Sequence, residues 1–425
     1  MKQSGIDWIG EIPDDWKIVQ PKALFSQRKE RAHVGDEQLT ASQKHGIINQ
    51  KKFMEIEQQR VVVVEKDFNI LKHVEPGDFV ISMRSFQGGL EYSQERGCIS
   101  SAYVMLIPNL NFVYPEYYKW LFKSYAYIKA LQSTSDLIRD GQALRYSNFA
   151  KIPLPLVPRL TQQRIAEYLD SKCAQIDSII EESKKSIEEY KAWKQSVIFE
   201  AVTGKNLNCK KKDSGIEWIG EIPEGWGVKR FKFVATSLEK GAGITKEEVF
   251  EDGDTPCVRY GEIYSKYNQS FSNCISKTFN SKIPVQKYFT NGDILFVGTG
   301  ELVEEIGKCI AYLGNENCLA GGDIIIAKHK QNPSFLSYAM NSSYAQNQKS
   351  RNKAKLKVVH ISATEIGDVQ IFLPPLPEQE SIAKMLDSKC AQIDSLIAEK
   401  ELLITDLTEY KKSLIFEVVT GKRSV

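Results

Sequence analysis

The chain has 425 residues, enough for two to four domains at roughly 100–200 residues each. Hydrophobic residues make up 42% of it and charged residues 26%, and this balance excludes a disordered chain and a fibrous protein. The formal net charge of +2 says little as a total. The longest purely aliphatic run, at 61–64, is far shorter than the ~20 apolar residues of a membrane-spanning helix, so we expect a cytoplasmic protein with no membrane partner.

The chain opens with a segment that returns in its second half. Residues 4–16 read SGIDWIGEIPDDW and residues 214–226 read SGIEWIGEIPEGW, with ten of thirteen positions identical. The sequence LDSKCAQIDS at 169–178 returns unchanged at 386–395, and SVIFEAVTGK at 196–205 returns as SLIFEVVTGK at 413–422. The chain is therefore one unit written twice.

Between these repeated segments each half contains a divergent α/β domain. Gly77-Asp78 and Gly292-Asp293 both precede apolar runs, which is the pattern of a turn that leads into a strand. Pro115 and Pro333 each open an amphipathic stretch with aromatic residues, which is the pattern of a helix start.

Each half ends in a long segment whose apolar positions recur in alternating steps of four and three, the seam of a coiled coil. Gly204 and Gly421 stand where a helix C-cap is expected, and Lys194 and Lys411 interrupt the two seams at the same heptad position. The seam residues are Leu169, Ile176, Ile180, Ile187, Leu386, Ile393, Ile397 and Ile404.

These patterns predict a mixed α+β fold of two pseudo-repeated globular domains separated by two long helices that form an antiparallel coiled coil. We expect a globular domain at either end of the paired helices. The expected boundaries are 1–158 for the first domain, 159–206 for the first long helix, 207–213 for a linker, 214–376 for the second domain and 377–425 for the second long helix.

The chain offers no constellation of catalytic residues. Residues 298–308 resemble a phosphate loop, but six residues separate Gly300 from Gly307 where the motif has four, and Cys309 replaces the hydroxyl that binds magnesium. The eight cysteines and five histidines lack the spacing of metal ligands. We therefore expect no active site, no metal and reduced thiols.

Positive charge collects in the globular domains. Residues 161–205 and 378–422 together have a net charge of −4, so the rest of the chain has a net charge of +6. In the stretch 324–364, which has no Asp or Glu, five basic residues fall at every second position: Lys349, Arg351, Lys353, Lys355 and Lys357. In an extended segment they would form a stripe on one face, which the phosphates of double-stranded DNA would neutralise. The alternative is a solvated basic loop.

Further side chains suited to hydrogen bonds with DNA stand in turn and strand clusters of both domains. The candidate DNA-binding residues are Lys44, His45, Arg84, Gln87, Arg139, Arg145, Arg259, Tyr260, Tyr264, Lys266, Lys353, Lys355, Lys357 and His360.

The boundary motifs agree in their order along the chain. SGI-[DE]-WIGEIP heads each half, LPPLPEQ at 373–379 opens the second helix, and IFE-x-VTGK closes both helices. With two divergent domains, this order resembles the DNA specificity subunit of a type I restriction-modification system, over the whole chain. One departure is PRLTQQ at 158–163, where the family usually has Pro-Leu-Pro-Glu-Gln, and we expect Thr161 to cap that helix.

The resemblance implies a subunit without a catalytic role. Each globular domain would be a target-recognition domain that reads one half of a bipartite, asymmetric DNA site, and the helix pair would set the spacer between the halves. Two modification subunits that hold S-adenosylmethionine would dock on it, and restriction subunits that use ATP and Mg would join the complex. The chain itself would bind no cofactor.

The residues also fit a second interpretation, a non-catalytic coiled-coil scaffold with two protein-binding modules. This interpretation explains the repeat and the long helices. It does not explain the basic stretch that lacks carboxylates, and the salt dependence of DNA binding distinguishes the two.

Overall fold

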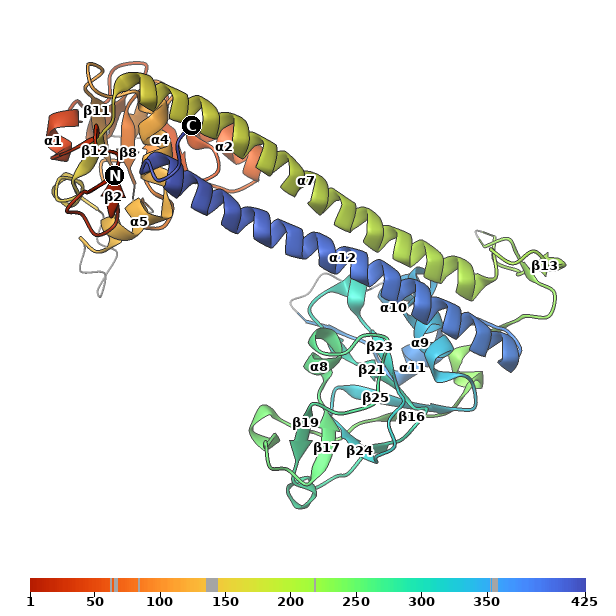
Figure 1. Ribbon diagram of the computed structural model, residues 1–425. Coiled ribbons are helices and arrows are strands. Elements are labelled where there is room, and N and C mark those ends of the chain that lie inside the picture. The colour runs from red at the N-terminus through yellow and green to blue at the C-terminus, as the bar shows by residue number, and fades with distance from the viewer. Residues whose placement is uncertain are drawn as a thin grey trace. The chain divides into compact units, whose positions relative to one another are not determined.

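The computed structural model describes residues 1–61, 63–64, 68–82, 85–134, 144–217, 219–351, 353 and 358–425. The chain forms two compact units, and each half of the sequence contributes to both (Figure 1). Unit 1 contains Met1–Lys184 and Glu401–Val425, and unit 2 contains Lys185–Lys400. Among the residues described, no helix combines the length and the apolar character that a membrane crossing requires.

Unit 1 is built around an antiparallel sheet with the strand order β4-β11-β8-β9. The strands are β4 (Phe25–Arg28), β8 (Phe79–Ile81), β9 (Glu91–Tyr92) and β11 (Val104–Pro108). The turn predicted at Gly77-Asp78 leads into β8, and helix α4 (Pro115–Lys123) begins at the predicted proline. Helix α4 packs on the sheet through Phe122, whose ring centroid lies 5.2 Å from that of Phe79.

Short strand pairs and helices complete unit 1. The pairs join β1 (Lys2–Gln3) to β2 (Glu11–Ile12), β3 (Lys17–Val19) to β12 (Leu154–Leu156), β5 (Leu39–Ser42) to β6 (Gly46–Asn49), and β7 (Lys72–Val74) to β10 (Gly97–Ile99). The helices are α1 (Pro21–Leu24), α2 (Gln50–Glu57), η1 (Phe68–Ile70), α3 (Ser85–Gly88), α5 (Tyr125–Gln132) and α6 (Tyr146–Phe149).

Unit 2 has two larger sheets. The first, in the order β16-β25-β21-β23-β18, contains β16 (Ala235–Lys240), β18 (Ser270–Phe271), β21 (Ile294–Val297), β23 (Cys309–Tyr312) and β25 (Ile324–His329). The second, in the order β19-β17-β24-β20, contains β17 (Thr255–Val258), β19 (Ser276–Thr278), β20 (Tyr288–Phe289) and β24 (Cys318–Ala320). The predicted turn at Gly292-Asp293 leads into β21, and α9 begins at the predicted Pro333.

Shorter elements surround these sheets. The strand pairs are β13 (Lys211–Asp213) with β14 (Glu221–Pro223), β15 (Gly227–Arg230) with β27 (Gln370–Leu373), and β22 (Thr299–Gly300) with β26 (Val359–His360). The helices are η2 (Phe231–Phe233), η3 (Lys246–Glu248), α8 (Tyr260–Ser265), η4 (Asn280–Lys282), η5 (Val303–Glu305), α9 (Pro333–Asn341), α10 (Ser343–Ser350) and α11 (Ala363–Asp368).

The two predicted long helices are α7 (Arg159–Thr203) and α12 (Leu376–Val419), and each contributes to both units. In unit 1, Leu169 and Ile176 of α7 share a core with Leu414 of α12. In unit 2, Ile198 of α7 shares a core with Leu386 of α12. The predicted antiparallel coiled coil is confirmed, because the start of α7 packs with the end of α12 in unit 1, and the end of α7 packs with the start of α12 in unit 2.

The seam lysines make the same ion pair in each unit. Lys411 lies 2.6 Å from a carboxylate oxygen of Asp177 in unit 1, and Lys194 lies 2.6 Å from one of Asp394 in unit 2. Among the seam positions, Ile187 and Ile393 are buried, whereas Ile180, Ile397 and Ile404 are half-buried. The two ion pairs stand at equivalent positions of the repeat, so the helix pair has an internal pseudo-symmetry.

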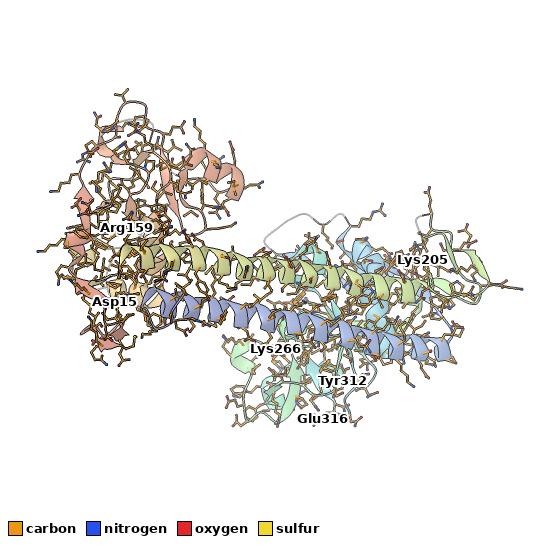
Figure 2. All side chains as sticks on the ribbon, turned by 45° about the horizontal axis from the view of Figure 1, so that its top comes forward. Asp15, Arg159, Lys205, Lys266, Tyr312 and Glu316 are labelled. Atoms are coloured by element: carbon orange, nitrogen blue, oxygen red, sulfur yellow. The ribbon has the colours of Figure 1, made fainter. Side chains whose placement is uncertain are left out.

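A buried glutamine anchors the start of each long helix. Gln162 accepts a hydrogen bond from the backbone N–H of Tyr114 at 2.7 Å, and its amide donates to two carbonyl groups. Gln379 likewise accepts from the N–H of Asn332 at 3.0 Å, just before α9. Helix α7 already begins at Arg159 (Figure 2), so Thr161 lies inside its first turn and the expectation that Thr161 caps the helix is wrong.

The predicted glycines end both helices. Gly204 and Gly421 adopt φ values of +69° and +74°, and the next residue donates its N–H five positions back, from Lys205 to Glu200 and from Lys422 to Glu417. This is the Schellman arrangement, which favours glycine.

Each helix end docks on the repeated head motif of its unit. A Cβ on Gly204 would lie 2.5 Å from the Pro223 ring, and one on Gly421 would lie 2.5 Å from the Pro13 ring. The head motif of the first half therefore receives the end of the second helix, and that of the second half receives the end of the first.

Candidate nucleic-acid interface

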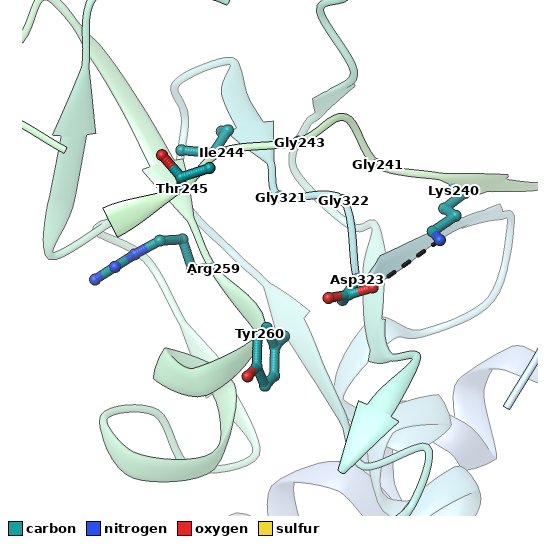
Figure 3. A pocket seen from close by; sticks show the side chains of 10 residues that line it. All are labelled: Lys240, Gly241, Gly243, Ile244, Thr245, Arg259, Tyr260, Gly321, Gly322 and Asp323. Atoms are coloured by element: carbon teal, nitrogen blue, oxygen red, sulfur yellow. Dashed lines mark ion pairs between the residues drawn. The ribbon is translucent and has the colours of Figure 1, made fainter. Parts of the chain in front are cut away.

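A cavity of about 430 Å³ opens at the surface of unit 2. Figure 3 shows Arg259 on one side of it, Lys240 and Asp323 on the other, and two glycine-containing loops between them. The lining residues are Lys240, Gly241, Gly243, Ile244, Thr245, Arg259, Tyr260, Gly321, Gly322 and Asp323.

The glycines let the two loops touch backbone to backbone. A Cβ on Gly241 would lie 2.2 Å from the carbonyl oxygen of Gly321, and one on Gly322 would lie 3.2 Å from the Cα of Gly243. The N–H of Gly241 donates to the carbonyl of Ile324 at 2.7 Å, which fixes the end of β16 beside the start of β25. Backbone without side chains therefore lines part of the cavity, and a ligand can approach it closely.

Arg259 is held in place at the N-terminus of α8. Its backbone N–H donates to Glu262 at 3.0 Å, and its guanidinium donates to the other oxygen of the same carboxylate at 2.9 Å. Glu262 is buried, while the Arg259 side chain is 29% exposed. Tyr260, the next residue, is 42% exposed. A guanidinium fixed by a buried carboxylate is oriented before any ligand arrives.

A second cavity, of about 370 Å³, shares the walls made by Lys240 and Asp323. His360 lines it, and the Nδ1 of His360 lies 3.1 Å from the hydroxyl of Thr299. Lys353 reaches its rim, because its ammonium donates to the carbonyl of His360 at 2.7 Å and also pairs with Glu365. We call the two adjoining cavities the unit 2 groove.

The unit 2 groove brings together four of the predicted residues, Arg259, Tyr260, Lys353 and His360. Asp323, whose side chain is 45% exposed, adds an acceptor 3.9 Å from Lys240. Donors and one acceptor side by side suit the edges of base pairs, because guanine presents acceptors to Arg or Lys and cytosine presents a donor to Asp.

Two further predicted residues of unit 2 belong to α8. Tyr264 donates long hydrogen bonds to the carbonyl groups of Thr299 and Glu305, and burial raises its pKa to about 12. Its hydroxyl therefore serves the fold. Lys266 follows α8 and is exposed (Figure 2).

The predicted basic stripe is wrong at its first position. Lys349 lies on helix α10, is 2% exposed and donates to the carbonyl of Gly307 at 2.7 Å, and burial lowers its pKa to about 8. A helix does not place alternate residues on one face, so the stripe cannot begin there. Arg351 is exposed, and Lys355 and Lys357 lie outside the described residues.

In unit 1 the predicted residues gather at the β5–β6 turn. Lys44 and His45 both contact the carboxylate of Glu57 on α2, at 2.9 and 2.8 Å. The exposed Gln87 on α3 is near this turn, because a Cβ on its neighbour Gly88 would lie 2.7 Å from the Gln43 side chain.

The remaining predicted residues of unit 1 are arginines. Arg145 is exposed at the start of α6, where its backbone N–H donates to Asn148 at 3.0 Å. Arg84 and Arg139 lie outside the described residues.

Sequence reasoning missed Lys240, Thr245 and Asp323 as lining residues of the unit 2 groove. The available signal was the pairing of Gly241-Ala242-Gly243 with Gly321-Gly322, since glycines so placed mark a close approach of backbone.

The family described as type I restriction modification DNA specificity domain matches residues 13–189 and 223–404. The chain is 24% identical to the type I restriction enzyme MjaVIII specificity subunit of Methanocaldococcus jannaschii, over 97% of this chain and 93% of the relative. It is 21% identical to the type I restriction enzyme EcoKI specificity subunit of Escherichia coli, over 97% and 90%.

Two solved structures share the fold. One comes from work on complex assembly and conformational transition of the type I R-M system, with a TM-score of 0.71 and 14% identity over 97% of this chain and 100% of the other. The HsdS subunit from Thermoanaerobacter tengcongensis has a TM-score of 0.56 and 15% identity over 97% and 98%. At these identities the similarity concerns the fold alone.

Proposed function

Because the chain belongs to the family of type I restriction-modification DNA specificity domains, we propose that it selects the DNA sequence on which a type I restriction-modification complex acts. Each unit reads one half of a bipartite, asymmetric site in double-stranded DNA. The observation that carries this proposal is the unit 2 groove, in which Arg259 is oriented by Glu262 opposite Lys240 and Asp323. The candidate residues of unit 1 read the other half-site.

The long helices set the spacer between the half-sites. Support comes from α7 and α12, each of which runs through both units and repeats the same ion pair. Such paired polar positions favour one register over its competitors in coiled coils. A fixed register gives the helix pair a fixed length, and this length sets the number of base pairs between the half-sites.

The proposed partners do the chemistry. Two modification subunits carry S-adenosylmethionine and methylate the site, and restriction subunits use ATP and Mg to act on unmodified DNA in the cytoplasm. This chain holds no cofactor and is not an enzyme by itself. The relatives named above are specificity subunits, which agrees with this division of labour.

The test of half-site reading uses the chain assembled with its modification subunits and measures methylation on substrates altered in one half-site. Arg259→Ala should lower discrimination at one position by ~1–3 kcal/mol, as expected for a lost bidentate contact. Gln87→Ala in unit 1 should change only the opposite half. The matched control is Lys282→Ala, an exposed lysine of unit 2 that stacks on Phe250 outside the groove and should change neither half. If Arg259→Ala and Gln87→Ala relaxed the same half-site, one domain for each half would be excluded.

The salt dependence of DNA binding tests the scaffold interpretation. Each phosphate contact adds ~0.9 to the slope of log K against log salt concentration, so replacing Lys353, Lys355 and Lys357 together by Ala should lower the slope by ~2–3. The loss should be similar on cognate and random DNA. A slope that stays unchanged within error in this triple variant would remove the three lysines from the DNA interface and favour the protein-binding scaffold.

A further inference from the structure

The guanidinium of Arg259 in the unit 2 groove has one edge occupied and another edge open. Its Nε and Nη2 atoms both donate to Oε1 of Glu262, at 3.3 and 2.9 Å. Among the residues that the structure describes, Nη1 of Arg259 makes no hydrogen bond and no ion pair. The edge between Nη1 and Nη2 therefore keeps one N–H from each nitrogen for a ligand.

The carboxylate of Glu262 is itself held at both oxygens. Oε2 accepts from the backbone N–H of Arg259 at 3.0 Å, and Oε1 also accepts from the hydroxyl of Ser276 on β19. The Glu262 side chain is 9% exposed. Strand β19 pairs with β17, which ends just before Arg259, so the sheet and the start of α8 together fix the carboxylate. A carboxylate fixed in this way holds the guanidinium in one orientation.

Two neighbouring N–H groups match the edge of one base in particular. In the major groove guanine presents two adjacent acceptors, O6 and N7. Adenine presents one acceptor beside an amino donor, thymine one acceptor beside a methyl group, and cytosine a donor, so each of them leaves an N–H of this edge unpaired. Phosphate oxygens also accept two N–H groups, but a contact with phosphate carries no sequence information.

On the basis of the function proposed above, we infer that the half-site read by unit 2 contains a guanine whose O6 and N7 accept from Nη1 and Nη2 of Arg259. Glu262 is a positioning residue for this contact. It touches no base, and it holds the guanidinium so that only guanine satisfies both free N–H groups. Ser276 supports Glu262 from the neighbouring strand.

The experiment uses the full chain assembled with its modification subunits and the DNA site that this complex methylates. Each guanine of the site is replaced in turn by 7-deazaguanine, which lacks the N7 acceptor, and the affinity for each DNA is measured at one salt concentration. We expect one position of the unit 2 half-site at which the parent complex loses affinity by ~10-fold or more, because a hydrogen bond to a charged group is lost. The replacement leaves the protein unaltered, so this result does not depend on the folding of a variant.

Variants then assign this position to Arg259. In Arg259→Ala the same 7-deazaguanine should change the affinity by less than ~2-fold, because the contact is already absent. The matched control is Arg230→Ala, which removes an arginine that pairs with Asp368 outside the unit 2 groove and should keep the parental sensitivity.

A further variant tests the positioning role. Glu262→Gln keeps the size of the side chain but replaces the carboxylate by a neutral amide, which holds the guanidinium less tightly. The preference for guanine over adenine at this position should fall by ~3–10-fold, while the affinity for random DNA stays within ~2-fold of the parent. In the Arg259→Ala background, Glu262→Gln should have no further effect on this preference, whereas a merely structural role would lower the affinity for every DNA.

The outcomes separate this inference from the proposed function. A site in which no guanine depends on Arg259 would overturn the inference and leave sequence-specific methylation in place. Equal losses of affinity for cognate and random DNA in Arg259→Ala would also overturn it, because they indicate a contact with phosphate. A complex that methylates DNA without sequence preference would refute the proposed function instead.

Discussion

The long helices and the globular domains differ in how closely the two halves of the chain agree. In the helices the agreement reaches single interactions, because Lys194–Asp394 and Lys411–Asp177 are one ion pair made twice at 2.6 Å. In the globular domains the two halves agree only in the strands and helices that they share, and the loop residues differ. Gly321 and Asp323 of the unit 2 groove correspond to Ser101 and Tyr103 in the first half. The repeated side chains pair the two long helices, whereas the differing side chains line the region where we propose that each unit reads its own half-site.

The largest expected effect tests the repeated docking of helix ends. Trp226 is 1% exposed, and its ring packs beside Gly204, where a Cβ would lie 3.2 Å from the ring. Its indole N–H donates to the carboxylate of Glu378 at 2.8 Å. Trp226→Ala should lower the free energy of unfolding of unit 2 by ~3–5 kcal/mol. Unfolding in urea, monitored by hydrogen exchange of the peptides of each unit separately, measures this loss.

Trp16→Ala is the matched change in unit 1. It should cost somewhat less, because Thr161 stands where the second half has Glu378. If Trp226→Ala changed the free energy of unfolding only slightly and only for the residues around position 226, or if it destabilised unit 1 instead of unit 2, the docking described here would be wrong.

The next effect concerns the buried glutamines. Gln379→Ala leaves the backbone N–H of Asn332 without its acceptor, and Gln162→Ala does the same to Tyr114. Each should lower the free energy of unfolding by ~1–3 kcal/mol, the cost of a buried unsatisfied group. Thermal unfolding measures the change. Gln163→Ala, at the exposed neighbouring position, serves as the control and should stay within ~0.5 kcal/mol of the parent.

The smallest effect belongs to the ion pairs of the seam. Lys194→Ala and Lys411→Ala should each cost at most ~1 kcal/mol, because the paired carboxylates are about half exposed to solvent and screened. Exchanging the partners, with Lys194→Asp and Asp394→Lys together, should restore the stability lost in either single variant. Unequal losses in the two halves, outside the error of chemical unfolding, would show that the pseudo-symmetry does not extend to energetics.

The sequence predicted what the repeat and its periodicities encode. The long helices, their glycine ends and the strand after each Gly-Asp turn follow from spacing and local conformational preference, so they could be placed without a structure. The expected start of α7 at residue 159 agrees with the structure, but the capping role of Thr161 was wrong, because the carbonyl of Pro158 accepts from the backbone N–H groups of Thr161 and Gln162.

The candidate site was only partly predictable. Arg259 and Tyr260 stood out as a local cluster, but the unit 2 groove also needs Lys240 and Asp323, which only the pairing of β16 with β25 brings together. The alternation of basic residues suggested an extended stripe, yet Lys349 is on a helix because the apolar positions around Tyr344 decide the local structure. Long-range pairing and burial are not visible in a single sequence.

The proposal that the helix pair sets the spacer between the half-sites is tested most directly by a paired insertion. Four residues are added after Ser183 and four after Lys400, close to where α7 and α12 pass from one unit to the other, so that each unit keeps its own contacts. Each insertion lengthens its helix by ~6 Å, close to two base pairs at ~3.4 Å each. The control is a four-residue insertion after Asn208, in the exposed linker between the two halves, which leaves both helices unchanged.

Methylation is then measured on a ladder of substrates that differ only in spacer length, with the chain assembled with its modification subunits. We expect the same half-sites and a preferred spacer longer by one or two base pairs in the paired-insertion variant, with the control peaking at the original spacer. A reduced signal that still peaks at the original spacer in the paired-insertion variant would contradict the account.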